Sequence, residues 1–409
     1  MSIIVQKFGG TSVSSTSHIK HIASKVLDEK SKGNQVVVVV SAMGDTTDLL
    51  NRMAIEMCPN PVKREVDMLL STGEQVTIAL LTLALHEMGA EAISFTGGQA
   101  GIHTDSVYGN ARITSINSQR ITKELNAGKI VIVAGFQGVT EEGDISTLGR
   151  GGSDTTATAL AARLGAERCD IYTDVDGVYT SDPRYIKKAK KISTLTYDDM
   201  LDLASRGAGV LHPKAVKHAK NFVVPLVVRS SFTKESGTLI TGHTRHSDSG
   251  NPIGIIFQRR QAGLFINSLE NIERTTLLDA LEKKHISIDM YEEEKEASFL
   301  IHEKNYAEVL EVLSEKGMVE GMHFHVKRNL AKLSVIGSNL KTYPVTREKV
   351  SKVLVRGEIP FTFVKDSHKS VSVVLKEEKM LSAAELLHTE FSLDATVGKK
   401  IKQVFAVQV

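Results

Sequence analysis

The sequence predicts an α/β fold: a buried, largely parallel sheet with helices on both faces, followed by two smaller βαββαβ modules. Two observations predict it. Over about the first 240 residues, short apolar runs alternate with segments of helical periodicity, and after that the order strand, helix, strand, strand, helix, strand appears twice. Uninterrupted apolar strands separated by helices are typical of parallel sheets covered on both faces. A chain of 409 residues is also too long for one core, so two or three domains are expected.

The strands expected in the first part are short apolar runs, several of them rich in β-branched residues. They are Ile3–Gln6, Val36–Val40, Ala92–Phe95, Ile130–Ala134 and Cys169–Thr173. Helices are expected at His18–Glu29, Glu65–Leu85 and Thr155–Leu164. Ligands of such sheets bind beyond the carboxyl ends of the strands. We therefore expect the chemistry in the loops that follow these runs.

The composition argues against several classes of protein. Lys and Arg number 50 against 48 Asp and Glu, so no strongly basic surface for nucleic acid is expected. The two cysteines, Cys58 and Cys169, lack metal-ligand spacing and fit a reducing cytosol. Apolar stretches such as Ile78–Leu85 are far shorter than a membrane span, and no signal peptide precedes the first strand. We expect a cytoplasmic protein without nucleic-acid or membrane partners.

Two small-residue loops follow the first two strands. Lys7–Val13 contains paired glycines, which let backbone N–H groups approach phosphate oxygens, and it precedes a helix N-terminus. An ordinary strand-to-helix turn is the alternative, and the spacing is not that of a P-loop. In Ser41–Thr47 the hydroxyls suit a small anionic substrate, although capping of the next helix explains them equally well.

A third loop, Thr147–Thr156, places Arg-Gly-Gly before the start of a helix. The planar guanidinium of Arg150 suits a carboxylate. Helix capping would explain Ser153 or Asp154, but it would not explain the preceding Arg-Gly-Gly. This loop therefore favours a binding function.

The fourth loop, Thr173–Arg184, is rich in Gly, Asp and Pro and contains Tyr179. A simple turn is one interpretation. Its polar groups beside an aromatic ring also suit a nucleotide base and ribose. Together the four loops indicate phosphoryl transfer without a covalent intermediate, in which cations neutralise charge on the transferred group.

Four motifs resemble the aspartate kinase family: Lys7-Phe-Gly-Gly-Thr-Ser-Val13, Gly149-Arg-Gly-Gly-Ser-Asp154, Thr173-Asp-Val-Asp-Gly-Val-Tyr179 and Ala208-Gly-Val-Leu-His-Pro213. That family has the amino acid kinase fold, an open αβα sandwich. The resemblance is strong over about residues 1–240 and architectural beyond them. It implies ATP- and Mg²⁺-dependent phosphorylation of the L-aspartate side chain to 4-phospho-L-aspartate, the first step toward lysine, threonine and methionine.

The resemblance also implies roles for individual residues. Lys7 would stabilise the transferring phosphoryl, Asp154 would orient the active-site lysine network, and Glu74 would bind the α-amino group of aspartate. The aspartate site would comprise Ser41, Thr47, Glu74, Phe136, Arg150 and Ser153. The nucleotide site would comprise Lys7, Phe8, Gly9, Gly10, Thr173, Asp174, Tyr179, Arg184, Gly209 and Val210. No protein ligands for a metal are expected, because the oxygens of ATP bridge Mg²⁺.

One position departs from the family pattern. Many members carry a second phosphate-contacting lysine where this chain has Gly209. Two compensations are open: the backbone N–H groups of Gly209 and Val210 suffice, or nearby Lys214 substitutes.

The C-terminal part resembles the paired ACT domains of that family, which dimerise and bind feedback amino acids. The expected boundaries are residues 1–241 for the catalytic domain and 252–329 and 330–409 for the modules, with a linker at Thr241–Asn251. The first module is expected to contain strands Gly263–Ser268, Ile286–Tyr291, Ala297–His302 and His323–Arg328 and helices Arg274–Lys284 and Tyr306–Lys316. The second is expected to contain strands Ala331–Ile336, Phe361–Lys365 and Ser370–Leu375 and helices Thr346–Val355 and Leu381–Glu390. A homodimer or higher oligomer is implied.

The effector-binding signature of such modules is poorly preserved. The loop Gly337–Val345 lacks a glycine after Pro344, and the acidic run Glu292–Glu296 would repel an amino-acid carboxylate. Asp289 alone remains at a plausible amine-binding position. Two interpretations stay open: drift in a module kept for dimerisation, and loss of feedback control.

Two other functions compete with aspartate phosphorylation. The first is a related kinase of the same fold that acts on another acidic amino acid. The second is a regulatory subunit without catalysis, which the charged set Lys7, Arg150 and Asp154 argues against. An ATP-coupled assay across acidic substrates separates these functions.

Overall fold

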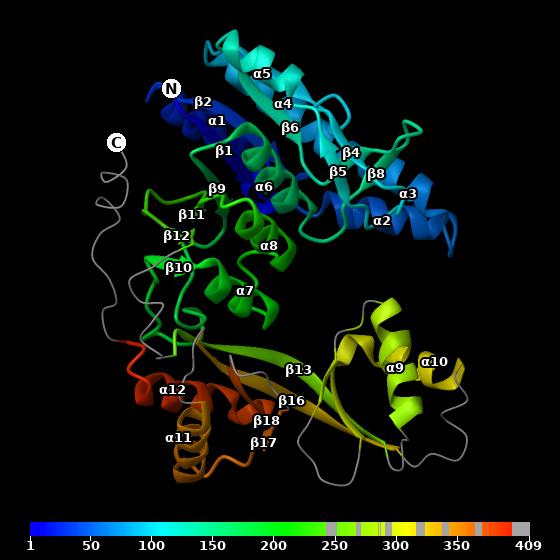
Figure 1. Cartoon of the computed structure of the whole chain (residues 1–409), viewed down its shortest axis with the longest axis vertical. Coiled ribbons are helices and arrows are strands. Elements are labelled where there is room, and N and C mark those ends of the chain that lie inside the picture. The colour runs from blue at the N-terminus through cyan, green and yellow to red at the C-terminus, as the bar shows by residue number, and fades with distance from the viewer. Residues whose placement is uncertain are drawn as a thin grey trace.

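The protein has an N-terminal α/β part and a C-terminal part built on one long, separate sheet (Figure 1). This computed structural model describes residues 1–242, 252–266, 271–284, 286, 288–290, 297–315, 324–337, 343–364 and 370–394. The predicted linker therefore lies almost wholly outside the described residues, as does the acidic run Glu292–Glu296.

An eight-stranded sheet forms the centre of the N-terminal part, with strand order β10-β12-β11-β9-β1-β2-β6-β3. Its strands are β1 (Ile3–Phe8), β2 (Gln35–Val40), β3 (Ala92–Phe95), β6 (Ile130–Ala134), β9 (Arg168–Thr173), β10 (Thr194–Thr196), β11 (Leu226–Ser230) and β12 (Thr238–Thr241). All five predicted strands are confirmed. Every neighbouring pair is parallel except β11 with β12. The carboxyl ends of β1, β2, β6 and β9 therefore lie along one edge of the sheet.

Two apolar cores cover the two faces of this sheet. The run of valines in β2 serves both, because Val36, Val38 and Val40 enter one core while Val37 and Val39 enter the other. The first core is closed by α1 (Thr16–Lys30) and α4 (Thr72–Glu87), and the second by α5 (Gln119–Asn126), α6 (Gly152–Leu164), α7 (Tyr197–Ser205) and α8 (Pro213–Asn221). Helices on both faces of a parallel sheet were predicted, and this is confirmed.

The predicted helix Glu65–Leu85 is two helices, α3 (Lys63–Leu70) and α4. The break has a physical cause at Ser71, whose backbone oxygen accepts a hydrogen bond from Gln137 Nε2 at 2.9 Å. By length and composition Lys63–Glu87 could cross a membrane. The inner face of α4 packs in the core through Ile78, Leu81 and Leu85, which accounts for much of this apolar character.

A small four-stranded sheet flanks the main one. Its order is β5-β4-β7-β8, formed by β4 (Ile102–Thr104), β5 (Ile113–Ile116), β7 (Gln137–Val139) and β8 (Ile145–Thr147). Helices α2 (Thr46–Met57) and α3 lie beside it (Figure 1). The third loop of the site leaves from β8 and enters α6, so this small sheet sets the position of Arg150.

The C-terminal part is a six-stranded sheet in the order β14-β15-β13-β16-β18-β17. Its strands are β13 (Gly254–Ile266), β14 (Asp289–Met290), β15 (Ala297–His302), β16 (Phe324–Ile336), β17 (Thr362–Phe363) and β18 (Ser370–Lys376), and its helices are α9 (Asn271–Lys283), α10 (Tyr306–Glu315), α11 (Tyr343–Arg356) and α12 (Met380–Glu390). Helices α9 and α10 lie at one end of β13 and β16, and α11 and α12 at the other (Figure 1).

The prediction of separate strands at His323–Arg328 and Ala331–Ile336 is wrong, because both belong to β16. The two paired strands β13 and β16 are irregular here but continuous. Asn329 and Arg260 adopt positive φ. The register between the two strands also shifts between Gln258 and Gly263. Such irregularities bend a strand and increase its twist without ending it. As a result β13 and β16 each run through both modules, while the domain boundaries themselves stay a prediction.

Candidate active site

The first loop folds tightly against its neighbours at the carboxyl end of β1. Gly9 donates its N–H to Tyr172 O at 3.3 Å, and Gly44 donates its N–H to Gly10 O at 3.0 Å. A β-carbon added to Gly10 would lie 2.9 Å from Gly44 O and 3.1 Å from Ala42 O. Only glycine therefore permits the first and second loops to pack this closely.

Lys7 and Asp154 form an ion pair that joins the first loop to the third. Lys7 Nζ lies 2.7 Å from Asp154 Oδ1, and the two side chains are only 12% and 13% exposed. The contact is an ion pair without hydrogen-bond geometry. Asp154 lies in the first turn of α6, where the helix dipole favours its negative charge. The pair therefore holds the ammonium at the edge where the strands end, beside Gly9.

Glu74 brings an unpaired carboxylate oxygen to the second loop. The residue is 2% exposed, and its Oε1 accepts the N–H of Ala42 at 3.0 Å. Its other oxygen, Oε2, is buried without a hydrogen-bond partner. Burial raises the pKa of Glu74 to about 8, which the Ala42 N–H only partly offsets. Once it is ionised, this carboxylate has a free oxygen that can accept a hydrogen bond from an ammonium group.

The hydroxyl residues Ser41 and Thr47 belong to the second loop, in which Ala42 donates its N–H to Glu74. Ser41 donates its backbone N–H to Phe8 O at 3.1 Å, and Thr47 lies in the first turn of α2. The N-cap of α2 is Asp45, without a side-chain capping bond. Neither hydroxyl is therefore the cap of this helix, and the structure does not support the capping alternative.

The third loop is held by close approaches at two glycines, one directly after β6 and one at the start of α6. A β-carbon on Gly135 would lie 2.8 Å from Ser153 Oγ, and one on Gly152 would lie 2.7 Å from the ring of Phe136. Phe136 itself has a φ of 70°, an unusual conformation for a bulky residue that is often found at functional sites. These contacts place Phe136 and Ser153 at the first turn of α6, which also carries Asp154.

Helix α6 begins at Gly152, three residues before the predicted start at Thr155. Its N-cap is Gly151 in the left-handed conformation, and that residue makes no side-chain capping bond. Ser153 and Asp154 therefore lie inside the first turn, and neither caps the helix. Arg150, just ahead of the cap, is exposed.

His212 is a site residue that the sequence reasoning missed. A β-carbon on Gly151 would lie 2.2 Å from the His212 ring, so the imidazole packs on the third loop. The pKa of His212 is lowered by burial and by Lys214, and Asp154 opposes this shift. The motif Ala208–Pro213 contains this histidine, but its spacing alone could not show that the ring reaches Gly151.

Lys214 is linked to the third loop through Asn110. Its Nζ donates to Asn110 Oδ1 at 2.6 Å, and that amide oxygen would lie 3.0 Å from a β-carbon on Gly149. Lys214 is not among the residues that line the pocket of the fourth loop, described below. The structure therefore does not support Lys214 as a substitute for the lysine that Gly209 replaces.

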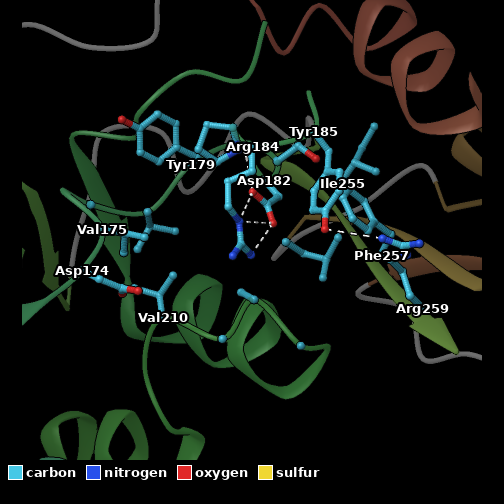
Figure 2. Close-up of a pocket in the computed structure, with 18 residues that line it drawn as sticks. Asp174, Val175, Tyr179, Asp182, Arg184, Tyr185, Val210, Ile255, Phe257 and Arg259 are labelled. Carbon is cyan, nitrogen blue, oxygen red and sulfur yellow. Dashed lines mark hydrogen bonds and ion pairs between the residues drawn. The ribbon is translucent and has the colours of Figure 1, made fainter. Parts of the chain in front are cut away.

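The fourth loop lines a pocket of about 390 Å³, a size typical of small-molecule sites. Five of the predicted nucleotide residues meet there: Asp174, Tyr179, Arg184, Gly209 and Val210. Figure 2 shows Arg184 in the middle of the pocket, with Asp174 and Val210 to one side and Ile255, Phe257 and Arg259 to the other. The last three belong to β13, so the C-terminal part supplies one wall. Nothing in the sequence of β13 indicated this contribution.

Polar contacts within the fourth loop fix its shape. The Tyr179 hydroxyl donates to Asp176 Oδ1 at 2.8 Å, and Lys191 Nζ lies 3.0 Å from Asp176 Oδ2. Burial and the Asp176 carboxylate raise the pKa of Tyr179 to about 12, so its phenol stays protonated. Arg184 pairs with Asp182 at 2.7 Å although its side chain is 80% exposed. Thr173 Oγ1 donates to Asp174 Oδ1 at 3.0 Å.

Phe8, one of the predicted nucleotide residues, has a side chain that lies in the core. Its side chain is fully buried and stacks on Tyr172, with ring centroids 4.6 Å apart. The ring belongs to the core under α1, so any contact between this residue and a nucleotide would involve its backbone. Gly209 has a φ of 67°, which favours glycine at that position, although a β-carbon there would meet only Gly207 O, at 3.8 Å.

Among the residues that the structure describes, no group of three His, Cys, Asp or Glu side chains is arranged to hold a metal ion. The acidic groups close to the site already have cationic or hydrogen-bonding partners, as the Lys7–Asp154 pair illustrates. This donor set fits a divalent cation that arrives on phosphate oxygens and contacts the protein at one or two carboxylates.

The chain is similar to known proteins over nearly its whole length. Residues 2–230 match the model of the Amino acid kinase family. An aspartokinase of Geobacillus stearothermophilus is 49% identical over 96% of this chain and 98% of its own length, and aspartokinase 2 of Bacillus subtilis (strain 168) is 47% identical over 96% and 98%. The structure resembles E. coli aspartokinase III in complex with aspartate and ADP (R-state), with a TM-score of 0.77, 25% identity, and 95% and 99% coverage of the two chains.

The matched range 2–230 contains every predicted site residue and all four loops described above. The conclusion rests on this coverage together with the full-length similarity to the curated relatives. The chain belongs to the amino acid kinase family, among its aspartokinases.

Proposed function

We propose that this protein transfers the γ-phosphate of ATP to the side-chain carboxylate of L-aspartate, forming 4-phospho-L-aspartate and ADP. The observation that carries the proposal is the Lys7–Asp154 ion pair, which places an ammonium among a Gly-Gly loop, a buried carboxylate and an arginine at one edge of the sheet. The ammonium and the Gly-Gly loop face the negative charge of the phosphates, the buried carboxylate binds the α-ammonium of aspartate, and the arginine binds a carboxylate of aspartate.

Recognition of the acceptor follows from two opposite charges. Glu74 Oε2, which has no hydrogen-bond partner, accepts a hydrogen bond from the α-ammonium of aspartate. The exposed guanidinium of Arg150 binds a carboxylate of the same substrate. Binding of the ammonium requires ionised Glu74, so a proton leaves this side chain as aspartate binds near neutral pH. Ser41, Thr47, Phe136 and Ser153 complete the acceptor site.

Transfer itself needs charge neutralisation and alignment. The carboxylate oxygen of aspartate attacks the γ-phosphorus as the bond to the β-phosphate oxygen of ATP breaks, and ADP leaves. Lys7 offsets the charge that spreads over the phosphoryl oxygens, and the N–H groups around Gly9 and Gly10 bind the phosphates. Asp154 keeps the ammonium in position through its 2.7 Å contact.

The nucleotide occupies the pocket of the fourth loop, between Asp174 and Val210 on one side and β13 on the other. Gly209 supports binding through its backbone, since Lys214 is engaged with Asn110. Mg²⁺ enters as part of the substrate, the MgATP complex, and neutralises the β- and γ-phosphates.

We further propose weakened feedback control by lysine and threonine. Asp289, the predicted acceptor for an effector amine, already holds the ammonium of Lys332 at 2.8 Å. The Lys332 side chain is 5% exposed, so an effector that displaced it would leave a buried lysine without its partner. The predicted effector loop is also different from expectation, because α11 already begins at Tyr343 and takes Pro344 into its first turn. Residues 338–342 of that loop lie outside the described residues.

The proposal includes three further features. The product enters the pathway to lysine, threonine and methionine, the protein is cytoplasmic, and the C-terminal modules form a homodimer or higher oligomer. The resemblance to paired ACT domains supports the last. The domain boundaries 1–241, 252–329 and 330–409 are proposed with it.

The deciding experiment is ADP release by the purified chain with L-aspartate, compared with L-glutamate and N-acetyl-L-glutamate. We expect ADP release with L-aspartate and none with L-glutamate or N-acetyl-L-glutamate. Turnover with another acidic amino acid in its place would favour a different member of the family, and the absence of turnover with all of them would favour a regulatory subunit.

A further inference from the structure

The fourth loop and the residues directly after it contact the second C-terminal module at several points. Ile186, 1% exposed, lies in the apolar core formed by β16, β18, α11 and α12. Tyr185 packs edge-on against Phe257, and its hydroxyl accepts a hydrogen bond from Arg259 at 3.4 Å. The loop is therefore partly a structural element of this module.

Thr180 is the polar centre of this contact. Its backbone N–H donates to Lys190 O at 2.9 Å, and its backbone oxygen accepts the N–H of Ile255, at the start of β13, at 2.8 Å. Its hydroxyl oxygen accepts the N–H of Lys190 at 2.9 Å. The neighbours Tyr179 and Ser181 line the nucleotide pocket, while Thr180 is 5% exposed and is not one of the lining residues.

The remaining partner of the Thr180 hydroxyl comes from 208 residues away in the sequence. His388 Nε2, on α12, lies 3.0 Å from Thr180 Oγ1, and the residue is 1% exposed. Its other ring nitrogen, Nδ1, is buried without a hydrogen-bond partner. The Thr180 contact is therefore the one polar interaction described for this ring, and a buried donor or acceptor left unpaired is costly.

We propose that His388 is a positioning residue for the nucleotide site. Its contact with Thr180 fixes the positions of Tyr179 and Ser181, which line the pocket. The conformation of the second module thereby affects the affinity for the nucleotide. The chemical class of the ligand is a purine nucleoside triphosphate or diphosphate, so the inference rests on the proposed function. It goes beyond that function because it makes a residue of the C-terminal module part of substrate binding.

The main test separates nucleotide affinity from aspartate affinity and from stability. For His388→Ala we expect the KM for ATP, and the Kd for ADP measured by calorimetry without aspartate, to rise about tenfold, as the loss of one buried hydrogen bond implies. The KM for aspartate should change less than twofold. His388→Gln, which keeps a polar nitrogen near the Nε2 position, should restore most of the affinity.

Two further variants make the test specific. Leu387→Ala removes a fully buried neighbour on the same helix that belongs to the apolar core, so it should lower the melting temperature without a selective change in nucleotide affinity. Thr180→Val should raise the KM for ATP as His388→Ala does, and the double variant should be no worse than either single variant. A KM for ATP within twofold of the wild type in His388→Ala, or a selective change in Leu387→Ala, would overturn the proposal.

The pH profile provides an independent readout. Burial lowers the pKa of His388, Lys188 lowers it further, and Asp394 opposes this shift. Protonation of this ring therefore requires a lower pH than that of an ordinary histidine, and an Nδ1–H would have no partner. As the pH falls into the acidic range, the KM for ATP should rise more steeply in the wild type than in His388→Gln; identical profiles would count against His388. A wild type without aspartate-dependent ADP release would refute the proposed function alone, because the calorimetric titration with ADP still tests His388.

Discussion

The two ends of the site are built differently. At the proposed acceptor end, Glu74 and Ser153 are 2% and 8% exposed and are held by backbone contacts within the N-terminal part. At the nucleotide end, the Arg184 side chain is 80% exposed, and the loop that carries it is packed on a different part of the chain. Burial fixes Glu74 and Ser153 before any ligand arrives, although Arg150 of the same end is exposed, whereas the loop at the second end is packed against the C-terminal module.

This difference has a functional consequence. A rigid acceptor end favours substrate selection and transition-state stabilisation, because groups held in place need not reorganise during the reaction. A nucleotide end that shares residues with a C-terminal module can respond to that module's conformation. We therefore expect substitutions at the acceptor end to change turnover and the KM for aspartate, and substitutions at the nucleotide end to change the KM for ATP.

The largest expected effect is that of Lys7→Ala. Removing the ammonium should lower kcat by about a thousandfold, because the charge on the transferring phosphoryl is then uncompensated. The melting temperature should stay close to that of the wild type. Lys20→Ala, at an exposed position of α1, is the control and should behave like the wild type. Near-normal turnover of Lys7→Ala would contradict the role of Lys7.

The second prediction concerns Glu74→Gln. Loss of the anion should raise the KM for aspartate about a hundredfold, as expected for a buried hydrogen bond to a charged group. In the wild type the KM for aspartate should fall as the pH rises toward about 8, where Glu74 ionises, and this dependence should vanish in the variant. Steady-state kinetics between pH 6 and 9 measure both effects, and a pH-dependent variant would argue against Glu74 as the titrating group.

The same carboxylate makes a prediction about stability. The folded-state pKa of Glu74 lies above its ordinary value of 4.5, so the stability that this raised pKa contributes is fully present below pH 4.5 and is lost as the pH rises through about 8. Glu74→Gln stays neutral and keeps this stability. At pH 8 the unliganded variant should therefore melt at a higher temperature than the wild type; a lower melting temperature would show that the orphan oxygen has an unrecognised partner.

A third, smaller effect compares the two ends directly. Arg150→Lys should raise the KM for aspartate about tenfold and leave the KM for ATP within twofold, because an ammonium cannot reproduce the bidentate fork. Arg184→Lys should show the reverse pattern, with a change of about threefold, since its side chain is mostly exposed. Equal changes in both Michaelis constants for Arg150→Lys would place this arginine at the nucleotide or in a structural role.

The smallest expected effect is the response to feedback amino acids. Because Lys332 already occupies Asp289, millimolar lysine or threonine, alone or together, should change activity less than twofold. Lys332→Met, which removes the internal ammonium and keeps the volume, frees Asp289 and should make the enzyme more sensitive than the wild type. Strong inhibition of the wild type by either amino acid would refute weakened control. Light scattering checks that the oligomer persists in both proteins.

Sequence alone was enough to predict the five strands and the loops that carry the site. The valine run of β2 and the Gly-Gly and Arg-Gly-Gly segments are local patterns, and parallel strands must end at one edge. It was not enough for the break at Ser71, which depends on Gln137, or for the continuity of β16, which depends on pairing with β13 across a bulge.

The site shows the same division. Its loops and most of its candidate residues follow from motifs in this sequence, because phosphate binding requires small residues and charges at fixed places near a strand end. Only the tertiary structure decided that Lys7 pairs with Asp154, that Glu74 is buried with a free oxygen, and that His388 reaches Thr180. The physical reason is that burial and contact between residues far apart in the chain depend on how whole elements pack, and no local pattern records that packing.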